Sequence, residues 1–179
     1  AGRRPVLMWS QWLKTNSYWT GRFFDLFVLI ANPGTADASV VATFLLPDGT
    51  TVVKPYTVAA NSRFNIWVDY EDARLADTAV STTIRSTNGV PVIVERAMWW
   101  PGPTPGTWYE AHNSAGATTT GTRWALADGL VNPTLNAETY ILVANTSGVA
   151  ADVKVTLLYA DGTSVDRTYT GLPAHSRFN

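Results

Sequence analysis

The chain of 179 residues contains no cysteine, and this absence removes several classes of chemistry at once. Without thiols there is no disulfide framework, no thiolate zinc site and no cysteine nucleophile. Charged residues are also scarce, at 15% of the chain against a usual value of about 25%. The formal net charge is -1, and the only basic run is the pair Arg3-Arg4. These features argue against nucleic acid and against an anionic membrane surface as partners.

Long apolar stretches and helical periodicity are missing as well. No run approaches the roughly 18 apolar residues that suggest a membrane-spanning helix, so we expect no membrane insertion. No 3.6-residue period persists over a window of about ten residues, which argues against helical bundles and α/β folds. Neither a phosphate-binding glycine loop nor a Gly-x-Ser-x-Gly turn occurs, so we expect no cofactor.

The sequence does contain an internal repeat of one stretch. Its first copy spans residues 27–65 and its second spans residues 140–179. Three pairs are separated by 113 residues, namely Phe27 and Tyr140, Asn32 and Asn145, and Asp48 and Asp161. Arg63 and Arg177 are separated by 114, so one residue has been inserted near Leu172-Pro173. An offset held over this length predicts a tandem β module.

Hydrophobic alternation places the strands and their inward faces. The stretch from Leu26 to Asn32 is apolar on both faces, which predicts a central strand covered on both sides or a sandwich strand near its middle. Pro55 predicts an edge strand or a bulge, because proline cannot donate to a neighbouring strand. Alternation in the second copy, carried back by register, predicts these core-facing residues: Val40, Ala42, Phe44, Leu46, and then Phe64, Ile66 and Val68.

Turn signals separate these strands every eight to twelve residues or so. Asp48-Gly49 and Asp161-Gly162 predict two-residue hairpin turns, and Asn88-Gly89 is the strongest hairpin signal in the chain. This pattern predicts an all-β fold, an immunoglobulin-like antiparallel β-sandwich. An up-and-down barrel is the competing topology.

We predict a complete sandwich module at residues 1–115 and the first half of a second, homologous module at 116–179. The second copy reaches only the position that Asn65 holds in the first. Three explanations stand side by side. The chain is truncated there, the two parts merge into one continuous fold, or strands from a neighbouring copy complete the open half by strand addition.

Candidate acidic groups have plain structural interpretations. Glu95 beside Arg96 could serve as an acid in a cleft. A structural ion pair, or an arginine stem lying over aromatic rings, explains the pair better. The acidic run at residues 69–72 offers oxygen ligands for calcium but lacks the spacing of a dedicated calcium loop, so we interpret it as a solvated turn.

The two histidines give no stronger signal. His112 lies between Glu110 and Ser114, which together contain the residue types of a hydrolase triad. Triads depend on geometry, however, and neither His112 nor His175 has the spacing of a metal ligand. We therefore predict a non-enzymatic protein with no catalytic residue and no metal site.

Aromatic residues are in excess, with 8 tryptophans in the chain. Exposed flat rings could stack on sugars, or they could seal the joint between neighbouring modules. The best binding patch on the sequence is the set Trp67, Trp99, Trp108 and Tyr109, next to the proline- and glycine-rich stretch at residues 101–106.

Several of these motifs occur together in a known order. The series is Asn32-Pro33-Gly34, Pro47-Asp48-Gly49, Ser62-Arg63, Ser86-Thr87-Asn88-Gly89 and Glu95-Arg96-Ala97-Met98-Trp99. It resembles a repeat of about 110 residues found in multi-copy secreted and cell-surface proteins of bacteria. The resemblance implies an immunoglobulin-like fold and an extracellular or cell-surface setting, and it carries no catalytic residue.

The function expected from this resemblance is a structural, adhesion or assembly module whose partners are neighbouring copies of the same module or chain. The alternative is a carbohydrate-binding module that holds polysaccharide on exposed tryptophan and tyrosine faces.

Overall fold

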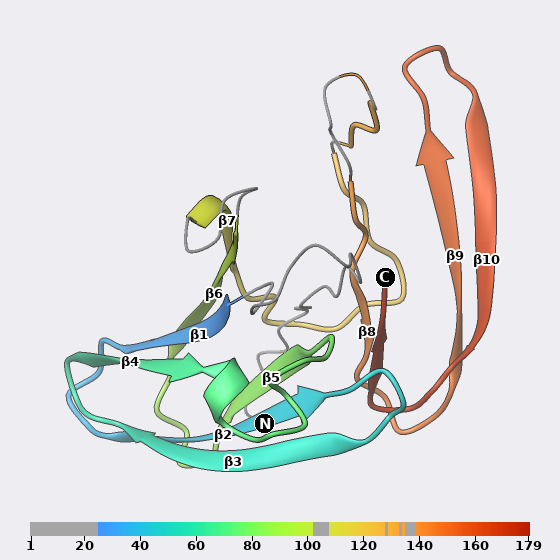
Figure 1. Cartoon of the computed structure of the whole chain (residues 1–179). Helices are drawn as coiled ribbons and strands as arrows, with labels where there is room; N and C mark the ends of the chain where they lie inside the picture. Colours follow the sequence, from blue (N-terminus) through green and yellow to red (C-terminus); the bar gives the residue numbers. More distant parts are fainter. Residues whose placement is uncertain (1–24, 102–107, 128, 133, 135–138) are drawn as a thin grey trace.

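The structure is a computed structural model that describes residues 25–101, 108–127, 129–132, 134 and 139–179 (Figure 1). The regular secondary structure of the described residues is almost entirely β-strand, with one turn of 3-10 helix, η1 (Val68–Tyr70). The part from residue 25 to residue 115 is termed the sandwich below. Its strands are β1 (Asp25–Asn32), β2 (Ala38–Leu45), β3 (Thr51–Val58), β4 (Ser62–Trp67), β5 (Ser81–Ser86), β6 (Ile93–Pro101) and β7 (Trp108–Ala115).

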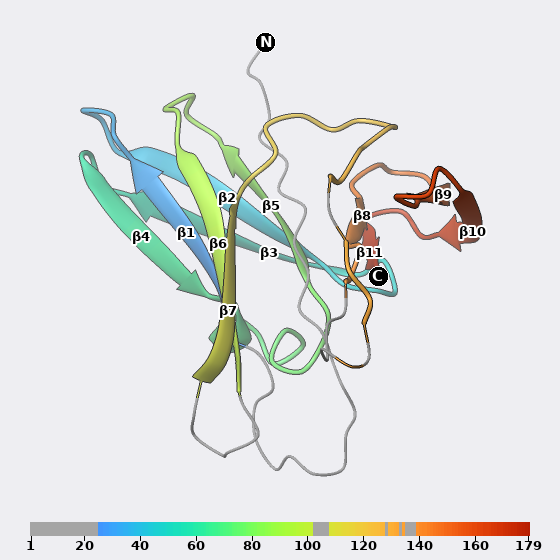
Figure 2. The ribbon, with the colours of Figure 1, turned by 90° about the horizontal axis from the view of Figure 1, so that it is seen from above.

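The sandwich consists of two antiparallel sheets (Figure 2). One sheet has the order β4-β1-β6-β7 and the other has the order β3-β2-β5. An all-β, sandwich-like fold is therefore confirmed, and β1 is the central strand that its two apolar faces predicted. The edge position of β3 agrees with Pro55, which lies within it. Counted from β1, this division of strands differs from the ABED and CFG sheets of an immunoglobulin constant domain.

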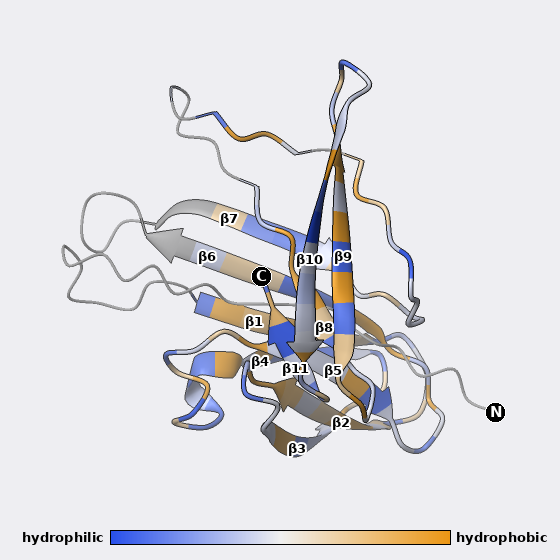
Figure 3. Cartoon of the chain, turned by 90° about the vertical axis from the view of Figure 1, so that its right-hand side faces the viewer, coloured by the Kyte–Doolittle hydropathy of each residue, from blue (hydrophilic) through white to orange (hydrophobic). Residues whose placement is uncertain are grey.

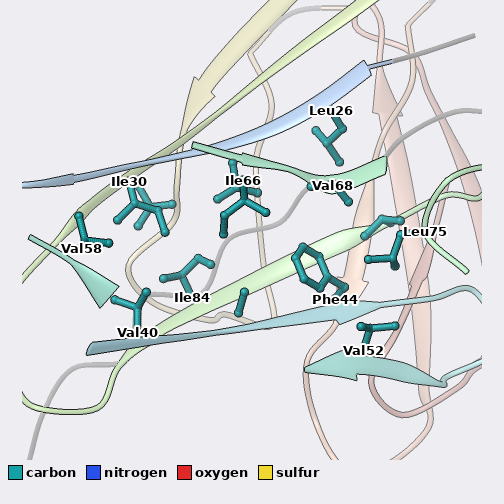
Figure 4. Packing of buried hydrophobic residues seen from close by; sticks show 14 of the residues in the cluster. Leu26, Ile30, Val40, Phe44, Val52, Val58, Ile66, Val68, Leu75 and Ile84 are labelled. Atoms are coloured by element: carbon teal, nitrogen blue, oxygen red, sulfur yellow. The ribbon is translucent and has the colours of Figure 1, made fainter. Parts of the chain in front are cut away.

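The core lies between the two sheets (Figure 4). Side chains of one sheet and of η1 meet those of the other, and Leu75 from the following loop closes one end of the cluster. The residues Val40, Ala42, Phe44, Leu46, Ile66 and Val68 are all buried, as predicted. The prediction for Phe64 is wrong, since 36% of it is exposed. It packs against Tyr56 with ring centroids 5.5 Å apart, and because β3 and β4 are both edge strands, this pair stays partly in solvent.

The turn between β2 and β3 is longer than predicted. The Gly49 N–H donates to the Leu46 carbonyl at 3.2 Å, and the Leu46 N–H donates to the Thr50 carbonyl at 3.0 Å. Positive φ occurs at Gly49 and not at Asp48, whereas the predicted two-residue type needs positive φ at both central residues or at the first. Pro47 contributes to this outcome because its ring holds φ negative. The Asp48 carboxylate then accepts from the Thr50 N–H and hydroxyl at 2.9 and 2.7 Å.

The hairpin predicted at Asn88-Gly89 is also wrong. The strands on either side of it, β5 and β6, lie in different sheets, so the turn crosses from one layer of the sandwich to the other. The Asn88 side chain explains why. Its Nδ2 donates to the Asp37 carbonyl at 2.8 Å, and its Oδ1 accepts from the Ser39 N–H at 3.2 Å. These bonds hold the turn against the start of β2 rather than closing a hairpin.

A buried asparagine amide ties the ends of three strands together. Asn32, the last residue of β1, is fully buried. Its Nδ2 lies 2.8, 3.0 and 3.1 Å from the carbonyl oxygens of Ala36, Val58 and Ala59. Its Oδ1 accepts from the Gly34 N–H at 3.0 Å. The amide therefore satisfies backbone groups of the β1–β2 turn and of the end of β3, groups that would be costly to bury unpaired.

The C-terminal segment (residues 143–179) has the pairing of the first copy. Its strands are β8 (Val143–Asn145), β9 (Ala151–Leu158), β10 (Ser164–Leu172) and β11 (Ser176–Phe178). Strand β8 pairs with β11 as β1 pairs with β4, and β9 pairs with β10 as β2 pairs with β3. The registers correspond residue by residue at the sequence offset. The inserted residue lies at an irregularity between Tyr169 and Leu172 in β10, where Gly171 has a φ of 71°.

The set of hydrogen bonds made by the buried Asn32 amide, termed the clasp below, recurs in this segment around Asn145. The Nδ2 of Asn145 lies 2.8, 3.2 and 2.9 Å from the carbonyl oxygens of Val149, Leu172 and Pro173. Its Oδ1 accepts from the Ser147 N–H at 3.1 Å. Each partner occupies the position that corresponds to a partner of Asn32. The two copies therefore share a specific set of buried bonds as well as a sequence pattern.

The C-terminal segment differs from the sandwich in what covers its strands. Among the described residues, no strand pairs with β9 where β5 pairs with β2, and none pairs with β8 where β6 pairs with β1. Leu157 is 38% exposed, although its counterpart Phe44 is fully buried. The β9–β10 hairpin stands away from the sandwich, and apolar residues alternate with polar ones along β9 (Figures 1 and 3).

The clasp makes a direct prediction for Asn32→Asp. The change keeps the shape of the side chain but turns a carboxylate oxygen toward three carbonyl oxygens. We expect a loss of about 3 kcal/mol or more in the free energy of unfolding of the sandwich, measured by urea denaturation. The control is Asn65→Asp, at an exposed position of β4, where we expect little change. Equal losses in the two variants would contradict the structural role of the clasp.

Candidate functional site

The sandwich and the C-terminal segment approach each other closely at Gly49. A Cβ atom added there would lie 2.9 Å from the Ala174 carbonyl oxygen and 3.3 Å from Pro173 Cβ. Below, the β2–β3 turn (residues 46–50) and its counterpart (residues 159–163) are termed tips. The stretches at residues 59–64 and 173–178 are termed corners, and the contact of tip with corner is termed the joint. Figures 1 and 2 both show the first tip beside β8 and β11.

Burial at the two corners supports this description. Ser176 and Arg177 are 0% and 3% exposed, whereas their counterparts Ser62 and Arg63 are half-buried and exposed. The C-terminal segment has fewer strands than the sandwich, so its own fold would leave its corner more exposed, not less. The extra burial must come from outside its own strands, and the first tip contacts it at this point.

The second corner contains a buried positive charge, Arg177. Arg177 Nη1 donates to Asn179 Oδ1, while Nε and Nη2 are buried without a hydrogen-bond partner among the described residues. Burial lowers the pKa of Arg177 to about 10, so the guanidinium remains charged at neutral pH. A buried cation without a countercharge costs free energy. The joint is therefore a close contact with a built-in penalty, as expected of a weak interface rather than of a core.

An aromatic cluster covers part of the outer face of the β4-β1-β6-β7 sheet. Phe27 stacks on Trp67 with centroids 5.1 Å apart and meets Trp99 edge-on at 5.2 Å. Tyr70 meets Trp67 edge-on at 4.3 Å. The indole Nε1 of Trp67 donates to Asp25 Oδ1 at 3.0 Å. Two residues of the predicted patch, Trp67 and Trp99, thus both contact the ring of Phe27.

The other two residues of the predicted patch are Trp108 and Tyr109. Their backbone belongs to β7, next to β6, and their side chains lie outside the described part of the chain. Trp67 is 37% exposed, with Phe27 stacked on its ring. Sequence reasoning missed Phe27 and Asp25 as members of the cluster. Their alternate positions on one strand were the signal that could have placed both on the face of Trp67.

Arg96 and His112 form a pair across β6 and β7. Arg96 Nη2 lies 2.9 Å from His112 Nδ1. A guanidinium can only donate, so Nδ1 accepts and the imidazole proton is on Nε2. Burial and the positive charge of Arg96 both lower the pKa of His112. This arrangement weakens the imidazole as a base, and it places a cation where a hydrolase triad would place a carboxylate.

The acidic residues of the η1 region have neighbouring partners. The Tyr56 hydroxyl donates to Glu71 at 2.6 Å, and burial together with this carboxylate raises the pKa of Tyr56. Arg74 pairs with Asp72 at 2.8 Å. Across the described ranges, no three acidic or histidine side chains come together in a group that could hold a metal ion. No helix in those ranges is long and apolar enough to cross a membrane.

Comparisons with known proteins inform the fold alone. No protein family and no curated protein matches the sequence. One solved structure is similar, the crystal structure of Thermotoga maritima 1070. It superimposes with a TM-score of 0.52 and 18% sequence identity, and the match covers 68% of this chain and 98% of that one. This likeness supports the sandwich architecture, with nearly the whole of that chain matched by about two thirds of this one.

The Arg96–His112 pair predicts a pH dependence of stability. The unfolded chain has a histidine with a pKa of about 6.5, and the folded state has a lower one. Below pH 6.5 the unfolded state therefore binds a proton that the folded state does not. The stabilisation is fully present above pH 6.5 and is lost as the pH falls toward the folded pKa.

The measurement is the free energy of unfolding between about pH 8 and pH 5. We expect the parent protein to lose stability over this interval more steeply than a His112→Gln variant does. The difference between the two profiles removes the contribution of the carboxylates, which both proteins share. Superimposable profiles would contradict the assignment of His112 as a neutral acceptor.

Proposed function

We propose that the chain is part of a tandem array of β-sandwich modules that serves as a structural, adhesion or assembly element of an extracellular bacterial surface protein. The joint is the single observation that carries this proposal. A tip of one copy lies against the corner of the next, at a glycine that leaves no room for a side chain. A close contact of this kind fixes the direction between successive units, which is what a stalk or spacer requires.

Two further features support the array. The buried bonds around Asn32 recur around Asn145, so each copy builds its tip and corner from the same parts. The sequence resemblance to multi-copy repeats supplies the extracellular setting. The proposal includes a likeness to immunoglobulin-like sandwiches in a broad sense: two antiparallel sheets joined by turns that cross between the layers. The likeness is no closer than that, because the strands are divided between the two sheets differently from those of an immunoglobulin domain.

The proposal is tested by the rigidity of the joint. The chain lacks cysteine, so spin labels can be placed at Val53→Cys and Leu158→Cys, both exposed positions. We expect a narrow distribution of label distances, because the joint fixes the two parts relative to each other. Introducing Gly49→Ala should broaden it, since the new Cβ would overlap the Ala174 carbonyl.

The matched control for this experiment is Gly89→Ala. Gly49 and Gly89 have similar φ values of 87° and 80°, so alanine carries a similar local strain of about 1 kcal/mol at each. A Cβ at Gly89, however, would meet nothing within 4 Å. We expect Gly89→Ala to leave the distribution narrow. A broad distribution in the parent, or the same broadening in both variants, would count against the structural role.

A carbohydrate-binding module is the second candidate, favoured by the aromatic cluster. Trp67 and Tyr70 expose 37% and 58% of their surfaces, and Asp25 lies beside the indole. Exposed rings suit the apolar face of a sugar, whereas the Asp25 carboxylate is only 6% exposed and serves the indole. The ring-on-ring contacts of Trp67 weigh against this candidate, because they occupy surface that a sugar would need.

Tryptophan emission distinguishes the two candidates. If the cluster binds sugars, soluble polysaccharides should quench or shift the emission in a saturable way, and Trp67→Ala should abolish the change. Trp124→Ala, which removes an exposed tryptophan outside the cluster, is the control and should leave the response intact. A purely structural module gives no saturable response with any polysaccharide tested.

A further inference from the structure

The joint inside the chain is made from one tip and one corner, while the chain contains two of each. The first tip and the second corner are in contact. The first corner (residues 59–64) and the second tip (residues 159–163) are left over, and among the described residues none of this tip and none of this corner is buried. Arg63 and Phe64 of that corner are exposed, as is every residue of that tip. The chain therefore has the two complementary halves of a second joint, facing different ends of the molecule.

The open tip and the open corner have the same backbone conformation as the tip and corner that form the joint. Gly162 in the open tip has a φ of 85°, and Gly49 in the occupied tip has a φ of 87°. In the corners, Asn61 and His175 have φ values of 50° and 52°. The Asn61 N–H donates to the Gly34 carbonyl at 2.9 Å, and the His175 N–H donates to the Ser147 carbonyl at 3.1 Å. No rearrangement of the main chain is needed before the open halves can meet.

The side chains at the contact are also compatible. The carbonyl that Gly49 approaches belongs to Ala174, and the corresponding residue of the open corner is again an alanine, Ala60. A Cβ at Gly162 would meet no atom of the described residues within 4 Å. The other neighbour of Gly49 is Pro173, and its counterpart in the open corner is the smaller Ala59, so no bulkier side chain stands in the way of the open tip.

We propose that the tip at residues 159–163 and the corner at residues 59–64 bind each other between copies of this module, in the geometry of the internal joint. The inference rests on the proposed function and names its partner, another copy of the same unit. A contact between two different surfaces is heterologous, and it extends into an open row unless the rotation closes a ring. The row then runs tip to corner through successive copies.

Such an interface is weak between separate chains. Inside the chain, the linker supplies an effective concentration on the order of millimolar, which a free partner lacks. Closing the contact also covers the corner arginine, Arg63, as Arg177 is covered now, and burying that charge opposes association. The contact therefore forms mainly between units held near one another, and its detection between free chains needs a method that accumulates rare encounters.

Paramagnetic relaxation meets this need, because it detects sparsely populated contacts and the chain has no cysteine of its own. One protein has a spin label at Asp166→Cys, an exposed position near the open tip whose counterpart Val53 stays 57% exposed beside the occupied tip. The second protein is the isotope-labelled parent, in which we expect selective broadening of the amide signals of residues 59–64. We expect Gly162→Ala in the spin-labelled protein to reduce this broadening at least about fivefold, because its Cβ would overlap the Ala60 carbonyl as a Cβ at Gly49 would overlap that of Ala174, while the matched control Gly89→Ala leaves it unchanged.

The outcomes separate this inference from the proposed function. Broadening spread evenly over the surface, or reduced equally by Gly162→Ala and Gly89→Ala, would overturn it, and so would broadening confined to residues 159–163, which indicates a symmetric contact. If residues 59–64 show no selective broadening while the intramolecular spin-label distances stay narrow, the internal joint stands and the chain does not extend through its open halves. If both experiments fail, the joint itself is wrong.

Discussion

The fold depends on a side-chain amide buried where three strands come together. Asn32 has one NH2 group within hydrogen-bond distance of three carbonyl oxygens from two separate turns, and its own oxygen accepts from Gly34. Two hydrogens serve three acceptors, so one hydrogen is shared. No apolar residue could occupy this position without leaving those carbonyl groups unpaired in the interior. The end of β1, the start of β2 and the end of β3 are therefore fixed relative to one another.

The corner and the joint follow from this constraint. Because the clasp fixes the end of β3, the chain turns into β4 through a residue with positive φ, and the corner takes the same shape in both copies. The tip owes its form to a separate pair of groups, the carboxylate of Asp48 or Asp161 and the threonine that follows it. Tip and corner are thus built independently, and the joint needs only a glycine where they meet.

The sequence was informative where local chemistry decides the outcome. The apolar alternation along β2 placed Val40 and Phe44 correctly, and the edge strand followed from Pro55, because side-chain period and proline chemistry act within one strand. The two stretches at an offset of 113 residues lie on strand pairs of corresponding register, β8 with β11 and β9 with β10. All-β architecture could thus be derived before any coordinates.

The errors arose where distant residues compete with local preference. Asn88-Gly89 favours a hairpin in isolation, but bonds from Asn88 to Asp37 and Ser39 hold it as a crossing between layers. Phe64 follows the inward alternation, yet its edge strand leaves it in solvent. The clasp was missed because asparagine before Pro33-Gly34 indicates a turn, and nothing local tells a surface asparagine from a buried one. Its recurrence at the end of the second apolar strand was the available signal.

The central claim is that two copies of one unit meet tip to corner within this chain. Its most direct test is the nuclear Overhauser effect between the α protons of Gly49 and the β protons of Pro173. The account predicts a strong cross-peak, since a Cβ in place of a Gly49 hydrogen would lie 3.3 Å from Pro173 Cβ. The corresponding α protons of Gly162 should show no such peak within a monomer. Absence of the Gly49 peak in a folded, assigned sample would contradict the claim.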